Sequence, residues 1–88
     1  MKELIQRHYE ATRKRGCITA DTDMKDFIEK MNEEFNEIEE SYYKESFSDS
    51  INETVDLIAV CLNAIHHFGF DFEELYSKNV KHQESRII

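Results

Sequence analysis

Apolar residues recur every three or four positions along most of this 88-residue chain. That period is typical of amphipathic helices, which bury one apolar stripe. It is clearest from about Asp23 to Lys44, where the expected buried stripe consists of Phe27, Ile28, Met31, Phe35, Ile38 and Tyr42. The same spacing predicts an earlier helix from about Lys2 to Arg15, built on Leu4, Ile5, His8 and Tyr9.

A third helix is predicted from about Ser50 to Phe68, and its middle is apolar on every side. Between Leu57 and Ile65 the sequence is LIAVCLNAI, in which the single polar residue is Asn63. A helix that is apolar all round is buried all round. Because one antiparallel neighbour cannot achieve that, we expect this helix to pack against more than the chain's own helices.

A fourth helix is predicted to begin at Asp71 and continue to about Ser85, with Leu75, Tyr76 and Val80 facing inward. The chain has no proline and only two glycines, so it lacks the residues that the tight turns of a β-rich domain need. The predicted fold is therefore all-α, and short connections favour an antiparallel four-helix bundle-like subunit. Residues 1–88 form one domain in this prediction, and oligomerisation completes its small core.

Acidic residues outnumber basic ones, 19 to 11, which gives a formal net charge of -8. Such a surface repels a phosphate backbone and disfavours broad binding to nucleic acid. The sequence has no apolar signal-peptide core near its start and no apolar run of about 18 residues. Cys17 and Cys61 form no disulfide framework. These features predict a cytoplasmic protein without nucleic-acid or membrane partners.

Two groups of acids stand out, Glu33-Glu34-x-x-Glu37 on the second predicted helix and Glu53-x-x-Asp56 on the third. Residues three apart share one side of a helix, so each helix presents a pair of carboxylates. Antiparallel packing can bring the four together. Hard oxygen ligands of this kind suit Mg²⁺ or Mn²⁺, and Glu33 can accept a proton from a metal-bound water.

A solvated acidic surface is the alternative interpretation. With 19 acids among 88 residues, pairs at this spacing also arise by chance, and acidic runs usually form solvated helix faces. One detail favours the metal site. Glu53 and Asp56 lead directly into the charge-free segment, where acids are unfavourable unless they are paired or bind a metal.

At these residues the sequence resembles the MazG-like nucleotide pyrophosphohydrolases of the all-α NTP pyrophosphatase superfamily. In that family an EExxE helix is followed by an ExxD helix. Here 15 residues separate the two motifs, and the resemblance extends over about residues 26–86. It implies Mg²⁺-dependent hydrolysis of a nucleoside triphosphate between its α and β phosphates, which gives a monophosphate and pyrophosphate. It also implies a homodimer or homotetramer.

The resemblance further assigns roles to individual residues. It implies metal ligands at Glu34, Glu37, Glu53 and Asp56. It implies catalytic roles for Glu33 and Glu34, with Glu33 orienting water or supporting a ligand. On the fourth helix it implies substrate contacts from Lys78, Asn79, Lys81 and Arg86. For this last set, a basic helix end that complements the helix dipole is an equal alternative.

Several interpretations stay open at this point. Asn63 and His67 can line a pocket or fill the core, and the Arg13–Arg15 cluster can contact phosphates or solvent. His66 and His67 are adjacent, so they point about 100° apart and cannot bind one metal ion from a regular helix. Two other functions also remain: a pyrophosphohydrolase for a phosphoribosyl nucleotide, and a non-catalytic helical module that binds a partner through the third helix.

Overall fold

The computed structural model describes residues 1–87 and is helical throughout its regular structure. Its elements are α1 (Lys2–Lys14), α2 (Met24–Lys44), α3 (Phe47–His67) and α4 (Phe72–Glu84). No strand occurs in residues 1–87. The prediction of an all-α chain with four helices is confirmed.

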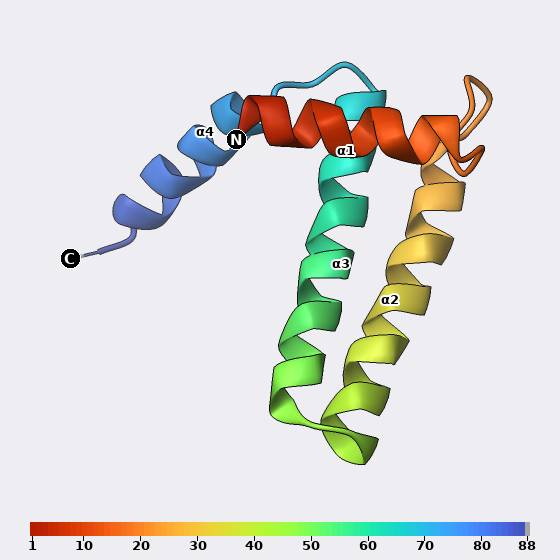
Figure 1. Ribbon diagram of the computed structural model, residues 1–88. Helices are drawn as coiled ribbons and strands as arrows, with labels where there is room; N and C mark the ends of the chain where they lie inside the picture. Colours follow the sequence, from red (N-terminus) through yellow and green to blue (C-terminus); the bar gives the residue numbers. More distant parts are fainter. Residues whose placement is uncertain (88) are drawn as a thin grey trace.

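The helices are arranged around an antiparallel hairpin of α2 and α3, which make the largest helix–helix contact in the chain (Figure 1). α1 crosses the hairpin where α2 begins and α3 ends, and it packs mainly on α3. α4 leaves the end of α3 and points away from the hairpin. The bundle-like part of this chain therefore consists of α1, α2 and α3.

The expectation that α4 buries an apolar face is wrong for the single chain. Leu75, Tyr76 and Val80 are 40%, 57% and 41% exposed, and no residue of α4 is buried. An ion pair of 3.4 Å between Lys2 and Asp71 links the start of α4 to α1. Because α4 touches the rest of the described chain only near its first turn, its inner face has nothing to pack on.

The helix ends follow from local capping chemistry. Asp23 and Asp26 form a reciprocal capping box at the start of α2. At α3 the cap is the Ser46 hydroxyl, which accepts from the Asp49 amide at 3.1 Å, so the helix begins earlier than the predicted Ser50. Gly16 has a φ of 78° just after α1, a left-handed conformation that favours glycine.

The buried side of α2 agrees only in part with the predicted stripe: Phe27 is buried and Met31 and Ile38 are half-buried, but the other three predicted residues are exposed. Its buried residues recur every seven positions, at Phe27, Glu34 and Ser41. Ile28, Phe35 and Tyr42, each the next residue along, are 47%, 53% and 57% exposed. The inner side of α2 thus mixes three apolar residues of the predicted stripe with the polar residues Glu34 and Ser41, and half of the apolar stripe expected inside lies outside.

A small core lies where α1 crosses the hairpin and consists of Tyr9, Ile18, Phe27 and Ala64. His67 fastens this crossing with both ring nitrogens. Its Nε2 lies 2.8 Å from the Thr22 carbonyl, which can only accept, so Nε2 carries the proton and Nδ1 accepts from the Tyr9 hydroxyl at 2.7 Å. His67 therefore has a structural role.

Within residues 1–87, no single helix is both long and apolar enough to cross a membrane. α3 and α4 meet that criterion only as a pair, and they are bent by 112° at the break between them.

Candidate metal centre

Three of the four predicted acids come together in space. One carboxylate oxygen from each of Glu34, Glu37 and Glu53 lies within 4.8 Å of the others. Glu34 and Glu37 are one turn apart on α2, and Glu53 faces them from α3 because the hairpin is antiparallel. The sequence spacing and the hairpin topology together account for this cluster.

Glu34 is the unusual member because it is only 7% exposed. It occupies a position on the α2 side that faces α3, where a helix pair normally places an apolar residue. Its Oε1 contacts the Lys30 ammonium at 3.2 Å, whereas its Oε2 is buried and has no hydrogen-bond partner among the described residues. A buried carboxylate oxygen without a partner is strongly unfavourable.

The electrostatics of Glu34 reflect this position. Burial raises the pKa of its carboxyl above the ordinary range, the hydrogen bond from Lys30 opposes that increase, and Glu37 adds to it. Glu53 is half-buried and Glu37 is exposed, so the cluster opens toward solvent on one side. The arrangement disfavours a third negative charge and favours a cation.

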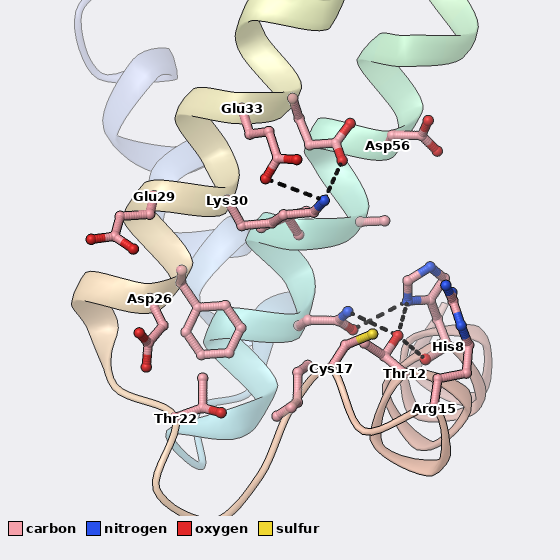
Figure 2. Close-up of a pocket in the computed structure, with 16 residues that line it drawn as sticks. His8, Thr12, Arg15, Cys17, Thr22, Asp26, Glu29, Lys30, Glu33 and Asp56 are labelled. Atoms are coloured by element: carbon pink, nitrogen blue, oxygen red, sulfur yellow. Dashed lines mark hydrogen bonds and ion pairs between the residues drawn. The ribbon is translucent and has the colours of Figure 1, made fainter.

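A lysine adjoins the cluster on its α2 side. Lys30 precedes Glu34 by one turn, and its Nζ lies 3.2 Å from Glu34 and 3.5 Å from Glu33 (Figure 2). Desolvation lowers the pKa of Lys30, but its hydrogen bond to Glu34 and the charge of Glu33 more than offset this, so its pKa is raised. Sequence reasoning missed Lys30, although its i, i+4 spacing to Glu34 was visible.

Asp56, the fourth predicted ligand, lies outside the cluster. It is exposed and sits almost one turn beyond Glu53 on α3. Figure 2 shows its carboxylate pointing away from Lys30 and Glu33. The structure therefore brings Glu34, Glu37 and Glu53 together but leaves Asp56 apart from them.

A cavity of about 560 Å³ adjoins the acids. Its walls are α1, the connection after α1, the first half of α2 and the middle of α3. Of the three clustered acids only Glu34 lines it, together with Asp26, Glu29, Glu33 and Asp56. The other side chains on its wall with hydrogen-bonding or charged groups include His8, Thr12, Arg15, Lys30 and Asn63. The cavity wall thus combines five acids with two basic side chains and several neutral polar groups.

Asn63 lies on the cavity wall although it is only 4% exposed. Its Oδ1 lies 3.3 Å from His8 Nδ1, and its amide donates to the Thr12 hydroxyl at 3.5 Å. It therefore both lines the cavity and ties α3 to α1. The same wall includes Arg15 but not Arg13 or Lys14.

The residues of the fourth helix that were predicted to contact the substrate do not reach this site. Lys78, Asn79, Lys81 and Arg86 are exposed, and the wall of the cavity contains no residue of the described part of α4. Lys78 instead pairs with Glu74 at 3.5 Å. For these side chains to contact a ligand in the cavity, α4 must come from a second copy of the chain or change its position.

No protein-family model, curated protein or solved structure matches this chain. The interpretation of the acids and the cavity therefore rests on their residues and geometry.

Proposed function

We propose that this protein is a Mg²⁺-dependent nucleoside triphosphate pyrophosphohydrolase of the MazG-like kind, which splits the α–β phosphate bond to give a monophosphate and pyrophosphate. The observation that carries the proposal is the buried, unpartnered Oε2 of Glu34, a residue of which one carboxylate oxygen lies within 4.8 Å of an oxygen of Glu37 and an oxygen of Glu53. A solvated acidic surface does not explain this atom, because solvated carboxylates have water as a partner.

The donor set suits a hard divalent ion. Three carboxylates from two rigid helices supply oxygen ligands and negative charge, the combination that Mg²⁺ and Mn²⁺ prefer. The ion would be held by Glu34, Glu37 and Glu53. Asp56 would join them only after its side chain changed conformation. When bound, such an ion polarises phosphate oxygens and lowers the pKa of a bound water.

The protein's own residues then have separate tasks. Glu33, with a side chain 61% exposed and on the cavity wall, accepts the proton of the attacking water. Glu34 would supply a metal-ligand oxygen from its buried position between α2 and α3. The cavity of about 560 Å³ receives the rest of the nucleotide, and Arg15 and Lys30 on its wall offset the phosphate charge.

Oligomerisation is part of the proposal because much apolar surface is open. On α3 the side chains of Ile51, Val55 and Ile58 are 48%, 58% and 50% exposed and lie at helical spacing. Burial of these side chains in a homodimer or homotetramer would complete the core. Light scattering after size exclusion should give two or four subunits for the wild type, and Val55→Glu should lower that number.

The decisive experiment for catalysis is a panel of canonical, deoxy and modified triphosphates plus a phosphoribosyl nucleotide, with Mg²⁺ and detection of pyrophosphate. Wild-type protein should act on at least one member, and Glu53→Gln should lose that activity. Glu40→Gln, which alters an exposed acid of α2 paired with Lys44, is the matched control. Absence of pyrophosphate release from every substrate would contradict the proposal.

A non-catalytic helical module is the second candidate, and the exposed apolar side chains of α3 favour it. The two candidates differ in metal binding. Calorimetric titration with Mn²⁺ should saturate for an enzyme with this site, whereas a pure interaction module should show no saturable binding.

A further inference from the structure

Lys30 contributes the positive charge nearest to Glu34 in the described chain. Its Nζ contacts Glu34 Oε1 at 3.2 Å and Glu33 Oε2 at 3.5 Å. Glu34 therefore has one oxygen on a cation of the protein itself and one oxygen without a partner. The ammonium group neutralises part of the cluster next to the oxygen atom at which an added cation would bind.

The position of Lys30 allows it to leave that contact. Its side chain is 48% exposed, in contrast to the 9% of Glu34, and it stands on the wall of the cavity of about 560 Å³. A lysine has a long, flexible stem and a compact charge that binds phosphate as a point contact. Space next to the ammonium group is thus available in the cavity.

We propose that Lys30 is a tethered cation that competes with a divalent metal ion for Glu34 and, once displaced, binds a phosphate group of the ligand in the adjoining cavity. This inference rests on the proposed function. Electrostatics supports the exchange, because the carboxylates attract both cations while the ammonium and the divalent ion repel each other. The released ammonium then meets the opposite charge of a phosphate oxygen.

The exchange gives Lys30 two effects of opposite sign. Without a ligand it weakens metal binding, because its ammonium group on Oε1 repels a divalent ion that binds at Oε2 of the same carboxylate. With metal and ligand present it strengthens ligand binding, because it supplies a charge-assisted hydrogen bond to phosphate. A lysine that only stabilises the helix would produce neither shift.

The test measures Mn²⁺ affinity by calorimetry and then the affinity for inorganic pyrophosphate at saturating Mg²⁺. Lys30→Met keeps the length of the stem and removes the charge. It should bind Mn²⁺ about twofold to fivefold more tightly, the range expected from loss of a partly exposed ion pair. It should bind pyrophosphate about tenfold or more weakly, as for loss of a hydrogen bond to a charged group.

Two controls separate this effect from general damage. Lys30→Arg keeps the charge and should stay within about twofold of the wild type for Mn²⁺, the size of a weak surface pair. Lys44→Met removes the same kind of i, i+4 pair, with Glu40 at 3.7 Å, away from the cavity and should change neither affinity. Circular dichroism of each variant establishes that it is folded.

The outcomes are distinct. Equal or weaker Mn²⁺ binding by folded Lys30→Met would overturn the competition, and unchanged pyrophosphate affinity would overturn the phosphate contact, while the proposed function would survive both results. If the wild type itself binds no Mn²⁺ saturably, the proposed function and this inference fail together.

Discussion

Replacement of Glu34 by glutamine should make the metal-free protein more stable. The substitution keeps the shape of the side chain and removes a charge that is nine-tenths buried. It also places an amide donor near the carboxylates of Glu37 and Glu53, where Glu34 offers only acceptors. Most substitutions at buried sites destabilise a protein, so an increase in stability would be a specific signature.

The expected gain in the free energy of unfolding follows from the distances in the cluster. Two unit charges 4.8 Å apart repel by about 0.9 kcal/mol in bulk water and about 3.5 kcal/mol at an effective dielectric constant of about 20. The bulk-water value for both neighbours of Glu34 gives about 1.7 kcal/mol. The neutral glutamine no longer forms an ion pair with Lys30, which lowers the free energy of unfolding by about 0.2–1 kcal/mol, the usual contribution of a partly exposed ion pair. A net stabilisation of about 1 kcal/mol remains, which corresponds to a Tm increase of about 4–8 °C in a domain of this size.

The assay is thermal unfolding followed by circular dichroism at 222 nm, first with EDTA at low ionic strength and then with Mn²⁺. The variant should unfold at the higher temperature in EDTA. With Mn²⁺ at 100 times its Kd, the wild type should gain about 2.7 kcal/mol by linkage. The variant should gain much less, so the order of the two Tm values should reverse.

A lower Tm for Glu34→Gln than for the wild type in EDTA would refute this reasoning. It would mean that Glu34 stabilises the protein mainly through its ion pair with Lys30 and that repulsion from Glu37 and Glu53 is small. Glu40→Gln is the control, because it changes an exposed glutamate of the same helix and should shift the free energy of unfolding by less than about 0.5 kcal/mol.

Three further predictions test other parts of the structure. Asp56→Asn should weaken Mn²⁺ binding less than Glu53→Gln, for which we expect about tenfold or more; equal losses in the two calorimetric titrations would place Asp56 in the cluster. His67→Phe should lower the free energy of unfolding in urea by about 2 kcal/mol, because two hydrogen bonds disappear. The hydrogen bond from the backbone amide of Glu74 lowers the pKa of Asp71. The stability from this cap is therefore present above the ordinary pKa range of aspartate and is lost as pH falls through the lowered pKa, so the Tm difference between wild type and Asp71→Asn should shrink in acid.

The parts of the fold that depend on residues close together in the sequence could be predicted from it. Helical periodicity located all four helices, and Asp23 and Asp71 marked the starts of α2 and α4. Prediction of the cluster of Glu34, Glu37 and Glu53 required one further inference, that the two helices pack antiparallel. An i, i+3 pair on one helix meets the next helix whenever a short connection makes the two antiparallel.

The inner side of α2 could be predicted only in part. Phe27, Met31 and Ile38 of the expected stripe are buried or half-buried, but the pattern contains two neighbouring lines of residues with a spacing of seven. Phe27, Glu34 and Ser41 face α3, whereas the residues that follow each of them form a more apolar line on the outside. The more apolar line is the natural choice for the core. Only the contact with α3 reveals that a glutamate and a serine occupy inner positions.

Asp56 and α4 depend on tertiary geometry that no local pattern specifies. Residues three apart on a helix differ in direction by about 60°. Glu53 and Asp56 therefore reach one point only for certain crossing angles of α2 and α3, and here Glu53 reaches it alone. The direction of α4 likewise depends on a few residues after His67, and its apolar face indicates burial without indicating the partner.

The position of Glu34 is the observation on which the proposed metal site rests. A chain with a net charge of -8 can separate its carboxylates easily, because glutamate side chains on exposed faces turn toward water. Here one acid is held between two helices with a free oxygen, and two more converge on it from a second turn and a second helix. Sequences that fold well avoid such local conflicts except where function requires them. A bound cation would supply the partner that Glu34 Oε2 lacks and would offset the repulsion among the three carboxylates. It would also let an anionic ligand approach an anionic protein.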